Sequence, residues 1–337
     1  MTTRGILLAN LGSPDAPERD AVRRYLNEFL MDRHVIDAPW PVRRLVVSLI
    51  LRRRPEASAR AYRAIWRDEE PGSPLLHWSE RLADALRQRV NVPVALGMRY
   101  GAPSLEDALK TLTAASVDEV LLMPLYPQHA GATRTTTIER ARAGASGRKL
   151  LVLPSFHDRP EYLQAMRHLL SQELPRDADH LLFSYHGLPE RQIRKADPTR
   201  GHCLRRPDCC EAASSAHAGC YRHQCLATTR SLAAGLTIPH STSFQSRLGR
   251  LRWLTPYTEE HLGELAGAGV RHLAVASPSF VADNLETLEE LGMKGEAAFR
   301  QAGGHRLTLI PCLNNRADWA DALAKWAALP SEELDLT

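Results

Sequence analysis

Short apolar runs alternate with amphipathic stretches along the whole chain. Arg4 to Ala9 has the pattern of a buried strand, and Asp20 to Met31 carries an apolar residue at each turn of a helix. The same alternation predicts strands at 93–98, 119–125, 149–156, 180–185, 271–276 and 306–310, and helices at 74–90, 104–114, 161–172, 221–234, 283–302 and 316–327. Strands that alternate with helices are typical of parallel sheets.

The alternation restarts near residue 158 of 337. It predicts an α/β protein of two Rossmann-like, doubly wound domains, an amino-terminal one over 1–158 and a carboxy-terminal one over 159–337. In such folds ligands bind beyond the carboxyl ends of the strands. The chain has neither Gly-x-Gly-x-x-Gly nor Gly-x-x-x-x-Gly-Lys-Ser/Thr, so the fold does not by itself indicate a nucleotide.

Charge and hydropathy narrow the choice of partners. The net charge is +4, from 43 basic and 39 acidic side chains, which is too small to indicate a nucleic acid. No signal-peptide pattern follows the first residues, and no window reaches the roughly 20 apolar residues of a membrane-spanning helix. We therefore expect a cytoplasmic protein whose membrane contact, if any, is peripheral at the inner face.

Two strand ends carry residues suited to metal and proton chemistry. His186 follows the apolar strand at 180–185, and an imidazole there can accept a proton or hold a metal. Asp283, Glu286 and Glu290 are spaced i, i+3 and i+7, which places them on one face of the predicted helix. Each feature alone has a plainer explanation, a hydrogen-bonded histidine or a solvated acidic face. Together they indicate a site that passes a divalent cation.

Six ordered segments give the chain a specific resemblance. The segments 184–189 (Ser-Tyr-His-Gly-Leu-Pro) and 280–290 (Phe-Val-Ala-Asp-Asn-Leu-Glu-Thr-Leu-Glu-Glu) resemble the two signature segments of ferrochelatases. Segments 7–14, 97–101, 125–128 and 244–249 with 253–257 match in the same order. The resemblance implies two Rossmann-like domains that enclose a porphyrin cleft. It also implies the reaction, insertion of ferrous iron into protoporphyrin or coproporphyrin to form haem, with release of two protons.

The resemblance also implies roles for individual residues. His186 and Glu286 correspond to the catalytic histidine and glutamate, and Asp283 and Glu290 continue the acidic row as metal-handling residues. The positions that line the porphyrin cleft are Arg99, Tyr100 and Trp253. Two departures weaken the match locally: 129–137 differs from the run that follows Tyr-Pro-Gln in many relatives, and Asn284 stands where a histidine or cysteine is frequent.

Five of the six cysteines lie between Cys203 and Cys225. In a cytoplasmic protein such thiols are expected to be reduced, and four can hold a 2Fe-2S cluster or a zinc ion. Some microbial ferrochelatases carry a 2Fe-2S cluster, so the resemblance favours the cluster over zinc. The ligands expected are Cys203, Cys210, Cys220 and Cys225.

The segment from Pro39 to Arg54 places apolar residues between two groups of arginines. It predicts either a helix that rests on a membrane surface or a buried helix with charged ends. Two other functions stay open at this point. One is a related chelatase that inserts cobalt or nickel into another tetrapyrrole, and the other is a non-catalytic haem or iron-sulfur binding protein.

Overall fold

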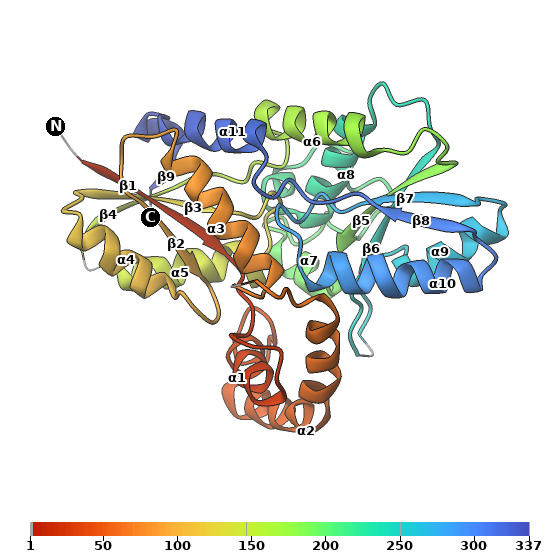
Figure 1. Cartoon of the computed structure of the whole chain (residues 1–337), viewed down its shortest axis with the longest axis horizontal. Coiled ribbons are helices and arrows are strands. Elements are labelled where there is room, and N and C mark those ends of the chain that lie inside the picture. Colours follow the sequence, from red (N-terminus) through yellow and green to blue (C-terminus); the bar gives the residue numbers. More distant parts are fainter. Residues whose placement is uncertain (1–2, 70, 146, 250, 337) are drawn as a thin grey trace. The chain divides into compact units, whose positions relative to one another are not determined.

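The computed structural model describes residues 3–69, 71–145, 147–249 and 251–336. Residues 1, 2 and 337, at the ends of the two predicted domains, lie outside the described residues. The chain divides into two compact units: 1–126, 131–155 and 314–337 form the first, and 127–130 and 156–313 form the second. Each contains one sheet covered by helices (Figure 1).

The first unit contains a five-stranded sheet of order β2-β1-β3-β4-β9. Four strands are parallel, and the short β9 adds an antiparallel edge to β4. Its strands are β1 (Arg4–Asn10), β2 (Val94–Met98), β3 (Glu119–Pro124), β4 (Lys149–Val152) and β9 (Asp335–Leu336). Its helices are α1 (Arg19–Leu30), α2 (Trp40–Ile65), α3 (Pro74–Arg87), α4 (Leu105–Ala114), the π-helix η1 (Gly131–Thr135), α5 (Thr136–Gly144), α11 (Ala317–Ala327) and the 3-10 helix η4 (Ser331–Glu333).

The second unit contains a parallel sheet of order β6-β5-β7-β8. Its strands are β5 (His180–His186), β6 (His240–Gln245), β7 (His272–Ala276) and β8 (Arg306–Leu309). Its helices are α6 (Pro160–Glu173), α7 (Glu190–Ala196), the 3-10 helix η2 (Ser215–Gly219), α8 (Tyr221–Ala233), α9 (Thr258–Gly267), the π-helix η3 (Glu286–Gly295) and α10 (Glu296–Gln301).

The predicted fold class, α/β with parallel sheets in two parts, is confirmed. The division differs from the expectation, because residues 127–130 belong to the second unit and residues 314–337 return to the first. Helix α11 packs against α3, β9 pairs with β4, and Arg4 donates hydrogen bonds to the carbonyls of Ala327 and Leu329. Strand pairing and packing of this kind involve residues far apart in the sequence, which hydropathy patterns do not reveal.

One face of each sheet forms an apolar core with its helices. In the second unit Leu182, Leu273 and Val275 of the strands pack with Leu262 of α9 and Phe299 of α10, and all five are buried. Each such side chain contributes about 1.5–3 kcal/mol when it leaves water. This packing sets the ends of β5 and β7, and therefore the loops that follow them.

The helix predicted over 283–302 needs correction, and strand β6 was missed. The helix predicted over 283–302 begins at Glu286 and is a π-helix as far as Gly295. The backbone N–H of Glu296 reaches the carbonyl of Leu291, an i to i−5 bond, which the spacing of apolar residues does not distinguish from an α-helix. Strand β6 was not predicted, because Ser241, Thr242 and Ser243 give it no apolar run.

Helix α2 is longer than the predicted segment and is only half buried. Val47 and Leu51 pack against Leu30 of α1. The opposite face exposes Trp40, Val42, Leu45, Val46 and Leu49. A buried helix with charged ends is therefore wrong, and an apolar face of α2 lies on the surface.

Candidate active site

His186 is the last residue of the buried apolar strand β5, and the chain turns sharply after it. Residues Leu181 to Tyr185 are buried, and His186 is half-buried. A Cβ atom on Gly187 would lie 2.8 Å from the carbonyl oxygen of Gln245 and 3.2 Å from Trp253. Only glycine lets the chain pass this close to β6, so Gly187 sets the position of the histidine.

The hydrogen bonds of His186 determine which ring nitrogen is available. Nδ1 lies 2.7 Å from the carbonyl oxygen of Gly187. A carbonyl can only accept, so Nδ1 carries the hydrogen and the neutral ring keeps its lone pair on Nε2. The backbone is held as well, because the Tyr221 hydroxyl donates to the His186 carbonyl at 2.7 Å. The result is an oriented imidazole with a basic Nε2.

Aromatic rings lie on two sides of the His186 imidazole. The ring of Trp253 is 6.4 Å away between centroids, and the ring of Phe280 is also 6.4 Å away. The indole N–H of Trp253 donates to the carbonyl of Leu248 at 3.0 Å, which holds the ring in place. Trp253 was expected here from the resemblance, whereas Phe280 was not expected to have a role.

Glu286 begins the π-helix η3, and Asn284 caps that helix. The Asn284 side-chain oxygen accepts hydrogen bonds from the backbone N–H groups of Glu286 and Thr287, at 2.9 and 3.1 Å. Asparagine commonly caps the amino terminus of a helix in this way. It explains why asparagine suits position 284 without any metal.

His186 and Glu286 interact electrostatically, so the structure brings them together. Burial raises the pKa of the Glu286 carboxyl, and the charge of His186 opposes that rise. The carboxylates of Glu290 and Glu289 raise the pKa further. Glu289 is itself paired with Lys294 at 2.8 Å. Glu286 therefore holds its proton more readily than a free glutamate and is sensitive to nearby charge.

Glu290 and Glu286 are both held by the end of β6. The Ser246 hydroxyl donates to Oε2 of Glu290 at 2.6 Å, and Nε2 of Gln245 donates to the Glu286 carbonyl at 2.9 Å. Ser246 has a φ of +66°, a left-handed conformation that is uncommon for serine. Roles for Gln245 and Ser246 were not predicted, because the only signal in the sequence was their place in the matching segment 244–249.

Asp283 has a different environment from the two glutamates. It precedes η3, and its Oδ1 accepts from the Thr287 hydroxyl at 3.2 Å and from the backbone N–H of Cys312 at 3.1 Å. These bonds tie the start of η3 to the segment after β8. A role for Asp283 in handling metal stays a prediction.

Arg99 and Tyr100 belong to the first unit, where they form a cluster with Asp32. Oδ2 of Asp32 lies 2.5 Å from Arg99, 3.0 Å from the Tyr100 hydroxyl and 2.5 Å from the Thr136 hydroxyl. The Arg99 guanidinium lies 4.2 Å from the centre of the Tyr100 ring. Tyr100 is fully buried, and its ring packs against the Arg99 guanidinium. Direct contact of either residue with a substrate stays a prediction.

All six cysteines are buried free thiols. Cys220 forms side-chain hydrogen bonds with Cys203 and Cys210, and Cys209 forms one with Cys210. The Arg222 guanidinium lies 3.1 Å from the sulfur of Cys210. Pairwise side-chain bonds thus link Cys203, Cys220, Cys210 and Cys209. Cys225 lies by Cys210 but bonds to the Tyr221 hydroxyl.

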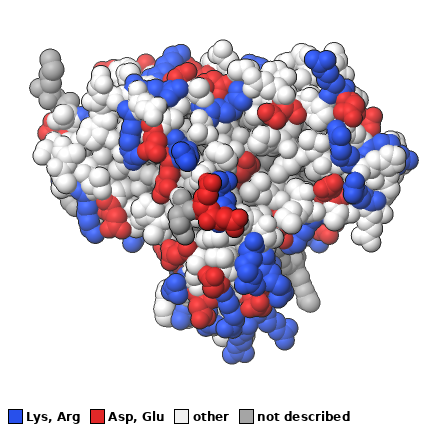
Figure 2. Space-filling view, viewed as in Figure 1, with Lys and Arg blue, Asp and Glu red and all other residues white. Residues whose placement is uncertain are grey.

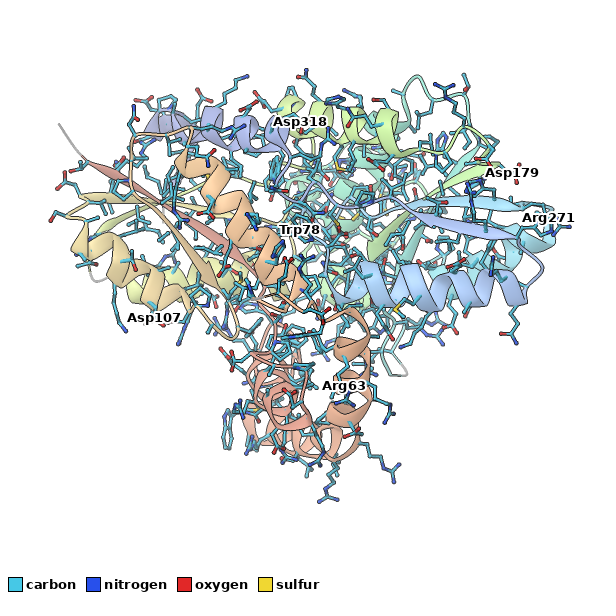
Figure 3. All side chains as sticks on the ribbon, viewed as in Figure 1. Arg63, Trp78, Asp107, Asp179, Arg271 and Asp318 are labelled. Carbon is cyan, nitrogen blue, oxygen red and sulfur yellow. The ribbon has the colours of Figure 1, made fainter. Side chains whose placement is uncertain are left out.

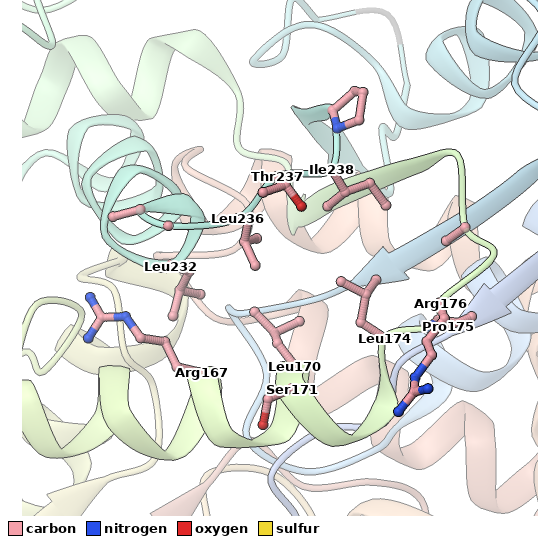
Figure 4. Close-up of a pocket in the computed structure, with 14 residues that line it drawn as sticks. Arg167, Leu170, Ser171, Leu174, Pro175, Arg176, Leu232, Leu236, Thr237 and Ile238 are labelled. Carbon is pink, nitrogen blue, oxygen red and sulfur yellow. The ribbon is translucent and has the colours of Figure 1, made fainter.

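The described part of the chain has no cluster of three or more His, Cys, Asp or Glu side chains arranged to bind a metal ion. A cavity of about 580 Å³ does occur in the second unit, lined by residues of α6, α8 and the segment before β6 (Figure 4). None of the residues predicted for the site lines it. It is separate from the strand ends that carry His186 and Gln245.

Comparison with known proteins identifies the family. The ferrochelatase family model matches residues 3–329. A ferrochelatase of Pseudomonas fluorescens (strain Pf0-1) is 53% identical over 333 residues, which cover 96% of this chain and 97% of that protein. A ferrochelatase of Azotobacter vinelandii (strain DJ / ATCC BAA-1303) is 52% identical over 339 residues, which cover 98% of this chain and all of that protein.

A solved structure supports the fold alone. SirB from Bacillus subtilis with Fe3+ matches over 98% of each chain with a TM-score of 0.54 and 11% identity. The family model and the full-length relatives establish the family. The chain belongs to the ferrochelatase family.

Proposed function

We propose that this ferrochelatase uses Nε2 of His186 to accept pyrrole protons and the carboxylates of Glu286 and Glu290 to deliver the iron. Its reaction is the insertion of ferrous iron into a porphyrin, an enzymatic metal insertion that forms haem. The observation that carries the division of roles is the Nδ1 bond of His186 to Gly187, at 2.7 Å. That bond leaves Nε2 as the free base.

The electrostatics of Glu286 suit delivery of a cation. Carboxylate oxygens are ligands that divalent iron accepts, and a carboxylate pair attracts a cation. Burial raises the pKa of Glu286, which means that its carboxylate form is destabilised. A bound Fe2+ would stabilise that charged form. Ser246 and Gln245 keep Glu290 beside it.

The chemistry at the ring centre sets what these residues must do. Two N–H protons leave the porphyrin as the iron sheds water and gains ring nitrogens. A base beside the ring removes protons, and aromatic walls such as Trp253 and Phe280 hold the ring in a geometry close to the transition state. Arg99 in the first unit is proposed as a further substrate-binding residue, with Tyr100 supporting it.

The test is haem formation by the purified chain under anaerobic conditions. Ferrous iron is supplied with protoporphyrin or with coproporphyrin, and the Soret band of the product is followed. Turnover with one of the two porphyrins identifies the substrate. Parallel reactions with cobalt and nickel test the choice of metal. Faster insertion of either metal than of iron would contradict the proposal.

We further propose that the cysteine-rich segment holds a 2Fe-2S cluster, with Cys203, Cys210, Cys220 and Cys225 as ligands. Support comes from the soft thiol donors and from the side-chain bonds of Cys220 to both Cys203 and Cys210. The bond to Cys220 and burial raise the pKa of the Cys210 thiol, and the Arg222 guanidinium opposes that rise. A cluster at this site would act as a bound prosthetic group, and no step of iron insertion is assigned to it.

Absorbance, paramagnetic resonance and metal analysis of anaerobically purified protein test the cluster. The serine variants Cys209→Ser and Cys225→Ser are compared directly, since both cysteines neighbour Cys210. Loss of the spectrum in Cys225→Ser with retention in Cys209→Ser supports the proposed set. The reverse result moves the fourth ligand to Cys209, and colourless protein with stoichiometric zinc overturns the cluster.

We also propose that α2 binds the surface of an anionic membrane. Its exposed face carries Trp40, which is 62% exposed, and Leu45, which is 63% exposed. Lys and Arg gather over this helix in Figure 2. Arginines at 43, 44 and 52–54 flank the apolar face, and this combination suits an interfacial helix. No helix among the described residues is long and apolar enough to cross a bilayer.

Flotation with vesicles tests this surface. We expect binding to vesicles that contain anionic lipid and much weaker binding to neutral ones. The variant Leu45→Ser with Leu49→Ser should lose binding, whereas Met293→Ser, at an exposed apolar residue of η3, should retain it. Equal flotation of all three proteins would contradict the proposal.

A further inference from the structure

A second polar constellation lies at the amino-terminal end of the sheet in the second unit. His180 is the first residue of β5, so it lies about 20 Å along the strand from His186. Asp179 and Arg271, labelled in Figure 3, lie at this end, where Oδ2 of Asp179 accepts from the backbone N–H of Arg271 at 2.8 Å. None of the residues proposed for iron insertion lies at this end of the sheet.

Three elements bring four side chains together there. Ser241 of β6 pairs in register with Leu182, so it shares a face of the sheet with Leu182 and His180. Helix α9 packs on that face through Leu262. His261 and Glu264 of α9 are spaced i and i+3, so they occupy one side of the helix.

The four side chains form a continuous chain of hydrogen bonds. Nε2 of His180 lies 2.8 Å from the Ser241 hydroxyl oxygen, which lies 2.9 Å from Nε2 of His261. Nδ1 of His261 lies 2.8 Å from Oε2 of Glu264. The sequence of groups is histidine, serine, histidine and carboxylate.

The acceptor at one end determines the direction of every bond. The Glu264 carboxylate can only accept, so Nδ1 of a neutral His261 carries the hydrogen and Nε2 has the lone pair. The Ser241 hydroxyl therefore donates to His261. It must then accept from Nε2 of His180, which carries a hydrogen.

His180 stays neutral in this arrangement. Burial, together with the charges of His261 and His240, lowers the pKa of His180 to about 4. Near neutral pH it is therefore a hydrogen-bond donor without charge. Its N–H points at the serine oxygen, where negative charge would form if the hydroxyl lost its proton.

Serine, a histidine base and a carboxylate that orients the histidine make up the arrangement of a nucleophilic triad. We propose that Ser241, His261 and Glu264 form a second reactive site, which acylates on Ser241 with activated esters. Ser241 is half-buried in an edge strand, so small reagents can reach it. Glu264 is 69% exposed, and water weakens its hold on His261. Reactivity is therefore confined to good leaving groups such as phenols and fluoride.

The reaction balances with water as the second reactant. The Ser241 oxygen attacks the carbonyl carbon of an aryl ester, and its proton moves to Nε2 of His261. The C–O bond to the aryl oxygen breaks, and the phenol leaves with that proton. Water then attacks the acyl-serine, passes a proton through His261 to the Ser241 oxygen, and releases the carboxylic acid.

Labelling with a fluorophosphonate tests the proposal directly. The serine oxygen displaces fluoride from phosphorus, and mass spectrometry of peptides locates the phosphonyl group. We expect stoichiometric labelling of Ser241, with hydrolysis of p-nitrophenyl acetate as the second readout. His261→Gln should slow both reactions about 100-fold or more, because it removes the general base.

The matched control is Ser171→Ala, at an exposed serine whose hydroxyl donates to a backbone carbonyl, that of His168, at 2.7 Å. Ser171→Ala should leave labelling unchanged, whereas Ser241→Ala should abolish it with the thermal unfolding midpoint preserved. If Ser241→Ala does not fold, the site of labelling in the unaltered chain still decides. Absence of label at Ser241, or labelling that survives His261→Gln unchanged, overturns the proposal and leaves the chain of bonds as a structural link between β5, β6 and α9.

Discussion

Gln245 holds the first turn of η3 through Glu286. Its side-chain N–H₂ group donates to the backbone carbonyl of Glu286 at 2.9 Å, and its oxygen accepts from the buried hydroxyl of Ser184 at 2.8 Å. Both ends of the amide are thus committed, which gives it one orientation. The carboxylate proposed to deliver iron is placed by β6 as well as by its own helix.

Substitution of Gln245 by alanine should impair catalysis because it loosens the placement of Glu286. It leaves the Glu286 carbonyl and the Ser184 hydroxyl without this partner, and loss of a buried hydrogen bond costs about 1–3 kcal/mol. We expect a lower kcat for iron insertion with porphyrin binding retained. Steady-state kinetics with separate kcat and KM values measure this, and Gln301→Ala, at an exposed residue of α10, is the control. An unchanged kcat would remove Gln245 from the account.

Removal of the Glu290 charge should shift the pH dependence of iron insertion. Glu290 raises the pKa of Glu286, so Glu290→Gln lowers that pKa and keeps Glu286 charged to a lower pH. The acid limb of the kcat profile should therefore move to lower pH, even if the maximum rate also falls. Glu259→Gln, at an exposed residue of α9, should leave the limb in place. A shift to higher pH would show that the limb does not report Glu286.

Gly187→Ala should displace the catalytic histidine. The new Cβ atom would lie 2.8 Å from the Gln245 carbonyl oxygen, and overpacking of this kind costs about 1–3 kcal/mol. We expect a folded protein with a reduced Tm and greatly reduced iron insertion. Gly263→Ala on α9, where a Cβ meets no atom within 4 Å, is the control for the added methyl group. Full activity in Gly187→Ala would contradict the tight approach of β5 and β6.

Asp32→Asn should destabilise the first unit in a pH-dependent way. Burial alone would raise the pKa of Asp32, but hydrogen bonds from Thr136 and His34 and the charge of Arg99 outweigh it and hold the pKa below its usual 3.8. The stabilisation is therefore complete above about pH 3.8 and is lost as the pH falls through the folded-state pKa.

Breaking this largely buried pair at neutral pH should cost about 3 kcal/mol. Urea unfolding across a pH series measures the difference between Asp32→Asn and the unaltered chain, which should shrink at acid pH. Asp68→Asn, at an exposed aspartate, is the control. A difference that stays constant with pH would mean that the charge of Asp32 is not the source of stability.

The sequence was sufficient for the parts of the molecule that have a strong local pattern. Among the described residues, apolar runs located seven of the nine strands, all with side chains buried in a core, as at Leu182. The polar strand β6 and the two-residue strand β9 were missed. The π-helical form of η3 was missed because apolar spacing does not report i to i+5 bonds. The positions of His186 and Glu286 came from motifs, but the partners that orient them, Gly187 and Gln245, depend on strands brought together by folding.

The proposed roles of His186 and Glu286 are tested most directly by measuring anaerobic iron insertion and porphyrin binding in His186→Ala and Glu286→Gln. We expect each variant to lose iron insertion, while porphyrin binding, followed by fluorescence quenching, stays measurable. Near-normal haem formation by either variant would contradict the pairing of Nε2 of His186 with the carboxylate of Glu286 as the reacting groups.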